Sequence, residues 1–196
     1  MSQRKSQAER RAHTQSAVLN SAIELFGSQG FHNTSLEDIA NHCGVTIRPI
    51  YHYFGNKLKL FEAVTEAMEA NILLTFSEAK ETPQANPVLA SLDGFLDLCC
   101  QADFRQIVLL DSPNVLGRKR WLNTEVSQQA KQHLLKSAEQ SADHWPIEKL
   151  ELITRVVMAS FAEIGLYIAE AEDLIGARKH VDELIVSLLQ PLARQP

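Results

Sequence analysis

The stretch GVTIRPIYHYFGNK, residues 44–57, reads as the end of one short helix, a tight turn and a second short helix. Gly44 suits the turn because it can adopt a positive φ without the steric cost of a Cβ. Pro49 stands where the second helix should already be running, and a proline inside a helix costs about 3 kcal/mol or more. With Thr46 as the N-cap, Pro49 is the third helical residue, whose N–H would have no partner in the helix. With Arg48 as the N-cap, Pro49 is the first helical residue, and the restriction that a proline places on the preceding residue favours this later start.

The sequence before this stretch predicts two further helices. Apolar residues at helical spacing indicate a first helix over about residues 12–29. Gly30 follows as a left-handed C-terminal cap, and Phe31 is placed to fold back onto the last turn. A second, short helix follows and ends at Gly44. Its overlapping capping-box candidates are Thr34 with Glu37 and Ser35 with Asp38.

The spacing of Ala40, Gly44 and Ile50 indicates a helix-turn-helix. A small residue at Ala40 lets the next helix cross closely, and Ile50 is expected to bury itself between the helices. In a helix-turn-helix that binds DNA, the N-terminal residues of the second helix meet base edges in the major groove. The alternative is an αα-hairpin inside an all-helical core.

The outward-facing side chains favour DNA over a simple hairpin. Arg48, in the first turn of the second helix, can form paired hydrogen bonds to a guanine or bind a phosphate. Other polar side chains cluster close to helix N-termini, where phosphates bind readily, or can donate to phosphate oxygens. These candidate phosphate contacts are Thr34, Ser35, Tyr51, His52 and Lys57.

The segment TSLEDIANHCGVTIRPIYHYFGNKLKLFEAV, preceded by AIELFGSQGF, resembles the DNA-binding domain of the TetR family of bacterial transcriptional regulators. The resemblance covers about residues 10–70. It implies the same phosphate contacts, with Thr46, Ile47, Arg48 and Pro49 facing bases. Members usually carry a small residue at the place of Pro49 and a polar one at that of Ile47. We therefore expect both side chains to contact thymine methyls or sugars, with Arg48 as the main base reader.

The charge distribution agrees with a DNA-binding head. The net charge of the chain is −5, but residues 1–57 carry six Lys or Arg and four acidic residues, whereas the remainder carries thirteen and twenty. A weakly basic head on an acidic body fits a protein in which only the head meets phosphate. The polar, basic N-terminus and the absence of a long apolar run predict neither a secretory signal nor a membrane span. The three cysteines lack metal-ligand spacing, so we expect reduced thiols and a cytoplasmic protein.

Beyond residue 57 the chain is predicted to be helical, with ETPQANP as a linker. The expected helices cover about 56–80, 87–101, 103–110, 118–141, 146–171 and 177–190. Small residues in the fifth of these and an apolar face in the sixth predict a dimer interface, as a four-helix bundle with a two-fold copy. The same stripes could instead bury within one monomer. The candidate interface residues are Ala159, Ala162, Gly165, Ala169, Val181, Leu184, Ile185 and Leu188.

The segment DFRQIVLLDSPNVLGRKRW, residues 103–121, interrupts an apolar run with Asp111, Ser112, Pro113 and Gly117. Such a break in a helical bundle is a reasonable place for a cavity, and a regulatory domain needs an element with two arrangements. His133 and His144 are further possible ligand contacts. The candidate pocket residues are Phe95, Cys99, Phe104, Leu109, Trp121, Val157, Phe161 and Tyr167.

Together these patterns predict an all-α protein, with a DNA-binding domain over residues 1–57 and an effector-binding and dimerisation domain over 58–196. The expected function is a ligand-responsive repressor that binds a palindromic double-stranded operator as a homodimer and releases it when a small molecule binds. The alternatives are a ligand-responsive activator and a helical adaptor that binds protein but not DNA. No nucleophile elbow, zinc-protease motif or phosphate-binding glycine loop is present, so we expect no enzymatic activity, cofactor or metal.

Overall fold

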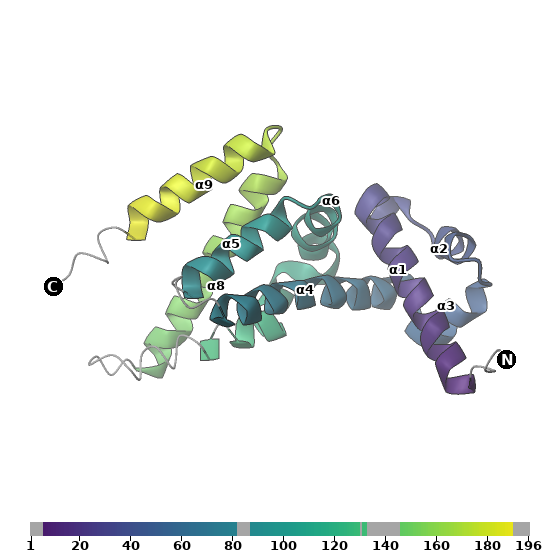
Figure 1. Cartoon of the computed structure of the whole chain (residues 1–196). Coiled ribbons are helices and arrows are strands. Elements are labelled where there is room, and N and C mark those ends of the chain that lie inside the picture. Colours follow the sequence, from purple (N-terminus) through teal and green to yellow (C-terminus); the bar gives the residue numbers. More distant parts are fainter. Residues whose placement is uncertain (1–5, 82–86, 130, 133–145, 190–196) are drawn as a thin grey trace.

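The computed structural model describes residues 6–81, 87–129, 131–132 and 146–189, and throughout these ranges the regular structure is helical (Figure 1). The prediction of an all-α fold is therefore confirmed. Most of the predicted linker, together with His133 and His144, lies outside the described residues.

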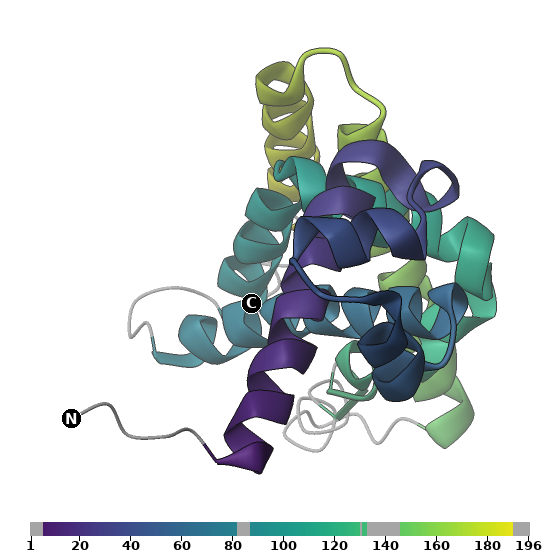
Figure 2. The same ribbon diagram turned by 90° about the vertical axis from the view of Figure 1, so that its right-hand side faces the viewer.

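Three helices form the head: α1 (Gln7–Asn33), α2 (Leu36–His42) and α3 (Ile47–Phe54). Helix α1 begins earlier than predicted because Ser6 and Glu9 form a capping box at its start. Seen from the head, α2 and α3 lie on the same side of α1 (Figure 2). The core of the head is formed by buried apolar side chains at Val18, Ala22, Phe26, Leu36, Ile39, Ala40 and Ile50.

Gly30 breaks α1 one turn before its end. Its φ of 80° and ψ of 165° lie in a region that only glycine adopts readily, and the chain bends there. The predicted positive φ is confirmed, although ψ is extended and not left-handed helical. Phe31 then turns back onto the core, with its ring centroid 5.9 Å from that of Phe26 and 4.9 Å from that of Phe61.

Helix α4 (Lys57–Glu81) runs from the head into the body (Figure 1). Its first turns bury Leu60, Phe61 and Val64 against the head, while its later turns pack against α5. One continuous helix therefore belongs to both parts, so that a shift of α4 in the body also moves part of the head core.

The body contains α5 (Pro87–Cys99), a short α6 (Ala102–Phe104), α8 (Ile147–Ala169) and α9 (Leu174–Leu189). Between α6 and α8 the chain forms π-helical turns η1 (Arg105–Asp111) and η2 (Pro113–Gly117) and a 3-10 helix η3 (Arg118–Asn123). A regular helix was expected over part of this segment. Gly117, with a φ of 89°, separates η2 from η3, and Pro113, which has no N–H, begins η2.

Helix α8 is long and apolar enough to cross a membrane by length and composition, with a mean hydropathy of 1.6 over its most apolar window. This single helix is weak evidence for a membrane span, since helices of other proteins pass the same criterion, and the expectation of no span stays a prediction. In the described structure α8 packs against η1, α5 and α9.

Candidate DNA-binding surface and effector pocket

A hollow of about 410 Å³ on the head brings the starts of α2 and α4 next to Tyr51 on α3. Three further predicted phosphate contacts, Thr34, Ser35 and Lys57, line the same hollow. Sequence reasoning missed the other polar residues there, because only the fold brings them to these helix starts. They are His32, Asn33, Glu37 and Asn56.

Ser35 is the N-cap of α2. Its hydroxyl oxygen lies 3.0 Å from the Asp38 amide nitrogen, which donates to it, and the Asp38 carboxylate accepts from the Ser35 amide at 3.0 Å. The hydrogen bonds from Ser35 lower the pKa of Asp38. This capping box fixes the orientation of α2, and of the two predicted candidates it is the one that forms.

Thr34 does not offer its side chain to DNA, so that part of the prediction was wrong. The residue is buried, and its hydroxyl donates to the Gly30 carbonyl at 2.9 Å and to the Leu25 carbonyl at 3.2 Å. The Gly30 carbonyl lies in the last turn of α1, where carbonyls have no partner within the helix. Thr34 therefore stabilises the end of α1.

Helix α3 begins at Ile47 with Thr46 as its N-cap, so Pro49 is the third helical residue and the later start was wrong. The turn before it is closed by a hydrogen bond of 3.0 Å from the Val45 amide to the Ala40 carbonyl. The hydroxyl of Thr46 makes no capping hydrogen bond. The predicted base-facing residues are exposed at Thr46 and Arg48 and half-buried at Ile47 and Pro49, while Tyr51 and His52 are exposed.

Lys57 is the first residue of α4, directly after Asn56, whose side-chain oxygen accepts from the Lys59 amide at 2.9 Å. The Lys57 ammonium lies 4.3 Å from the centroid of the Phe31 ring, a cation–π distance. Burial lowers the pKa of Lys57, and the negative charge of Asp111 opposes that shift. The ammonium is thus held at the rim of the hollow.

The body contains a cavity of about 440 Å³ between η1, η2, η3 and α8. Of the eight predicted pocket residues, Leu109 and Trp121 line it. Two residues predicted for the dimer interface, Ala159 and Ala162, line it as well; Ala159 is exposed and Ala162 is half-buried. The other lining residues are Val108, Leu110, Ser112, Pro113, Asn114, Gly117, Arg120, Arg155, Glu163, Leu166 and Glu170.

The structure does not place the remaining predicted pocket residues on this cavity. Phe95, Cys99 and Phe104 are fully buried in the core, where burial raises the pKa of Cys99 to about 12. Phe161 packs against Phe95 with ring centroids 5.3 Å apart. The last two, which also do not line the cavity, are the half-buried Val157 and the exposed Tyr167, whose hydroxyl lies 3.2 Å from His180 Nδ1.

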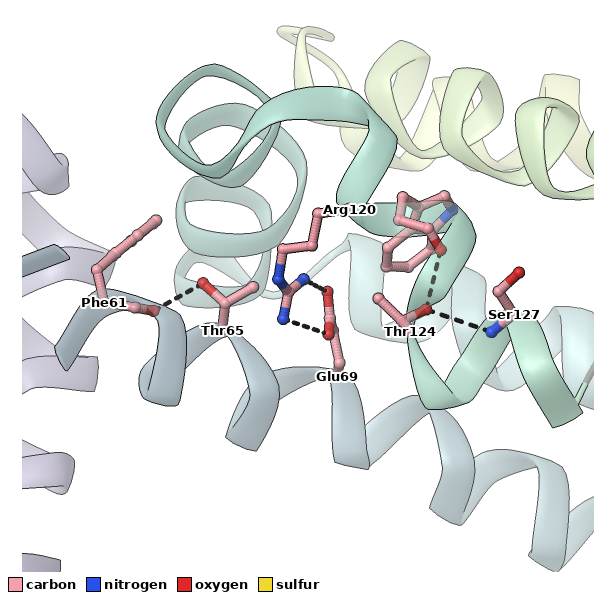
Figure 3. A network of polar contacts seen from close by, with 7 residues as sticks. Phe61, Thr65, Glu69, Arg120, Thr124 and Ser127 are labelled. Atoms are coloured by element: carbon pink, nitrogen blue, oxygen red, sulfur yellow. Dashed lines mark hydrogen bonds and ion pairs between the residues drawn. The ribbon is translucent and has the colours of Figure 1, made fainter. Parts of the chain in front are cut away.

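A polar network joins the pocket wall to α4 (Figure 3). Arg120, which lines the cavity, donates to both carboxylate oxygens of Glu69, at 2.5 and 3.0 Å. Burial raises the pKa of Glu69 more than its pairing with Arg120 lowers it. The neighbouring Trp121 has a buried Nε1–H with no hydrogen-bond partner in the part of the chain that the structure describes.

The predicted dimer residues divide into inward and outward groups. Gly165 is buried inside the monomer, because a Cβ there would lie 3.1 Å from Leu109 Cδ2, and Val181 is also core. The assignment of these two residues to an interface was therefore wrong. Ala169 and Ile185 pack partly against the same core but are only half-buried, and Leu184 is exposed, so for these three the assignment stays a prediction. The side chain of Leu188 lies outside the described ones. On α8, exposed apolar side chains lie along one side of the helix, here called the outer face, at Leu152, Val156 and Tyr167. On α9, Ile175 and Leu184 are also exposed, but they are nine residues apart and lie on opposite sides of the helix.

A helix-turn-helix head, a long connecting helix and a helical body with a cavity define the class of helix-turn-helix transcriptional regulators. Residues 18–64 match the family described as bacterial regulatory proteins, tetR family. Residues 86–192, more than half of the chain, match the family described as tetracyclin repressor-like, C-terminal domain. The chain belongs to the TetR family of bacterial transcriptional regulators.

Individual relatives resemble the head in sequence and the whole chain in fold. The chain is 32% identical to the regulator UidR of Escherichia coli K12 over 68 residues, which are 35% of each protein. It is 42% identical to AcrR of Shigella flexneri over 59 residues, 30% of this chain and 27% of AcrR. A crystal structure of a TetR-family regulator from Pectobacterium atrosepticum aligns with a TM-score of 0.76 at 22% identity, over 98% of this chain and all of the other.

Proposed function

We propose that this protein is a ligand-responsive repressor that binds a palindromic operator as a homodimer in the cytoplasm and releases it when a small molecule enters the body cavity. The observation that carries the proposal is the ion pair between Arg120 in the cavity wall and Glu69 on α4. Helix α4 starts at Lys57 in the DNA-facing hollow, so one rigid element touches both sites.

At the DNA, the proposed roles follow from exposure and position. Arg48 is exposed in the first turn of α3 and reads base edges, while Ile47 and Pro49 offer apolar surface beside it. Tyr51 and Lys57, which both line the hollow, bind phosphates. His52 is a further phosphate contact of the same surface, whereas the Ser35 amide already donates to the Asp38 carboxylate.

The proposed dimer uses the outer face of α8 together with exposed apolar side chains of α9. Leu152 and Val156 are 62% and 56% exposed, and Ile175 is 84% exposed, which is costly for large apolar side chains unless a partner covers them. A two-fold pairing of these helices gives a four-helix bundle and presents two heads to half-sites about 34–36 Å apart or a multiple of that spacing.

The proposed effector has an apolar body and at least one polar group. The cavity wall is mostly apolar, with Leu109, Ala162 and Leu166 among its members, and Arg155, Glu163 and Glu170 stand at its exposed part. An effector that prefers a cavity shape with wrongly spaced heads weakens DNA binding, and DNA weakens effector binding by the same factor, about 5–150-fold for a coupling of 1–3 kcal/mol.

The test is fluorescence anisotropy with the chain's own upstream DNA. The double variant Arg48→Ala with Lys57→Ala should lose sequence-specific affinity, and Lys57→Ala alone should lower the salt dependence by about one released ion. Lys59→Ala is the matched control, because Lys59 is exposed two residues further along α4 but does not line the hollow. A dimer that binds no DNA at low salt would support the adaptor instead.

The sign of regulation is tested separately with a reporter gene under the protein's own operator. Deletion of the regulator should raise expression if it represses, and lower expression if it activates. A compound that enters the cavity should change the fluorescence of Trp121 and, in parallel, release the operator.

A further inference from the structure

The end of α1 makes one hydrogen bond to the body that secondary structure does not require. The Phe31 amide donates to Oδ2 of Asp111 at 2.7 Å, across 80 residues of sequence. The amide is available because Gly30, with its glycine-only backbone angles, breaks the helical hydrogen-bond pattern just before it.

Asp111 lies between two residues that line the cavity, but it does not line the cavity itself. Leu110 and Ser112, its two neighbours in sequence, both line that cavity, and Asp111 is the last residue of the π-helical turn η1. Since consecutive residues of a helical turn move together, a change at Leu110 or Ser112 also moves the Asp111 carboxylate. Single π-helical turns are frequent at functional sites.

On the head side of this hydrogen bond, Phe31 contacts Lys57, one of the proposed phosphate contacts. Phe31 stacks on Phe26 and packs at a tilt against Phe61, and the Lys57 ammonium lies 4.3 Å from the centroid of its ring. Burial lowers the pKa of Lys57 and the charge of Asp111 opposes that shift, so the carboxylate and the ammonium are close enough to interact. The contact is crowded, since a Cβ on Gly30 would lie 3.4 Å from Asp111 Oδ2.

We infer that Asp111 is a positioning residue that holds the head in its DNA-binding orientation through the Phe31 amide and transmits changes in the cavity wall to it. This inference rests on the proposed function and adds a second connection, independent of the Glu69–Arg120 pair on α4. An effector that displaces η1 withdraws the acceptor from Phe31 and frees the head from its orientation.

Two substitutions separate the hydrogen bond from the charge. Asp111→Ala and Asp111→Asn both remove one negative charge, which by itself strengthens DNA binding equally in both. Only Asp111→Asn keeps an oxygen that can accept from the Phe31 amide. We expect Asp111→Ala to bind the operator at least about fivefold more weakly than Asp111→Asn.

Asp103 supplies the matched control. It lies at the same junction, since its Cβ would meet a Cβ on Gly27 of α1 at 2.7 Å, but its carboxylate accepts from the Phe104 amide of its own segment. Asp103→Ala and Asp103→Asn should therefore bind the operator equally within about twofold. Equal affinities for the two Asp111 variants, with DNA binding intact, would overturn the inference alone. A wild-type protein that binds no DNA would overturn the proposed function as well.

Transmission to the cavity is measured without an effector, with operator DNA as the probe. In a Trp145→Phe background Trp121 is the remaining tryptophan, and it lines the cavity. Saturating operator should change its fluorescence with Asp111 or Asn at position 111 but not with Ala. If the response survives in Asp111→Ala, the inference is wrong.

A measurement on the wild-type protein covers the case in which Asp111→Ala fails to fold. Hydrogen exchange at the Phe31 amide and at residues 108–112 should slow together when operator is added. If operator slows exchange elsewhere in the head but leaves these amides unchanged, the contact does not transmit and the inference is wrong.

Discussion

Arg120 in the cavity wall and Glu69 in the middle of α4 form a bidentate ion pair. The Nη1–Oε1 and Nη2–Oε2 distances are 2.5 and 3.0 Å. Both side chains are mostly buried, with 16% and 6% of their surface exposed. Removing water from two charges is expensive, so this pair contributes less to stability than its short distances suggest. Its value lies in fixing which face of α4 meets the pocket.

Substituting one partner of this ion pair should destabilise the protein far more than replacing both partners with apolar residues. Glu69→Leu leaves Arg120 buried without its partner, and Arg120→Met leaves Glu69 buried without its partner. Each single substitution should lower the free energy of unfolding by about 3–5 kcal/mol. The double variant should lose clearly less than the sum of the two. Urea unfolding of the four proteins gives the coupling, and additive losses would contradict a direct interaction.

The raised pKa of Glu69 gives a pH dependence with a definite sign. Because the folded state holds this proton more tightly than the unfolded state does, stability from this group is greatest below its ordinary value of 4.5 and falls as pH rises through the raised pKa. The free energy of unfolding should be measured against pH for the wild type and for Glu69→Gln. The wild-type value minus the variant value should decline as the pH rises through this window. A difference that grows with pH would show that Arg120 lowers the pKa instead.

Gly30 should tolerate no side chain. Alanine there would have to adopt a glycine-only conformation, at about 1–3 kcal/mol, and its Cβ would lie 3.2 Å from Gln106 Nε2. Gly44→Ala is the control, because Gly44 also has a positive φ of 69° but nothing lies within 4 Å of its added Cβ. Thermal unfolding should show the larger loss for Gly30→Ala, and equal losses would mean that the contact with η1 is unimportant.

Base preference should depend on Pro49 and Arg48 in different ways. Arg48→Ala should weaken the free energy of operator binding by about 1–3 kcal/mol and relax specificity at the base pair that Arg48 reads. Pro49→Thr should leave the base preference at that base pair unchanged but alter the base preference at a neighbouring base pair, because it replaces an apolar contact with a hydroxyl. Selection of binding sites from a random DNA library measures both, and an unchanged consensus for Pro49→Thr would refute its contact with bases.

The outer face of α8 should be required for dimerisation. Val156→Glu places a charge in the middle of the exposed apolar face and should shift sedimentation from dimer to monomer. Leu74→Glu is the control, because Leu74 on α4 is equally exposed, at 59% against 56%. A wild-type protein that sediments as a monomer at micromolar concentration would remove the basis for a two-fold operator.

The head could be predicted well because its signals are local. The Ser35 cap, the turn at Gly44 and the buried Ile50 depend on residues within one or two turns of each other, and the structure has all three. Thr34 was misjudged because its partners, the carbonyls of Leu25 and Gly30, appear only once the break in α1 is known.

The body was predicted less well because its site is built from contacts distant in sequence. A stripe of small residues on α8 cannot reveal which members face another molecule: Gly165 accommodates Leu109, whereas Ala159 and Ala162 face the cavity. Asp111 looked like a helix breaker, and its contact with Phe31 needs the arrangement of η1 against α1. The interrupted segment was nevertheless correctly singled out, because proline and glycine within an apolar run disturb a helix wherever it packs.

The central claim is that this chain binds DNA through its helix-turn-helix as a two-fold dimer. The most direct measurement is a footprint of the purified protein on its own upstream region at low salt. The account predicts two protected half-sites related by two-fold symmetry, lost in the Arg48→Ala, Lys57→Ala double variant and retained in Lys59→Ala. Protection without symmetry, or no protection by a folded dimer, would contradict it.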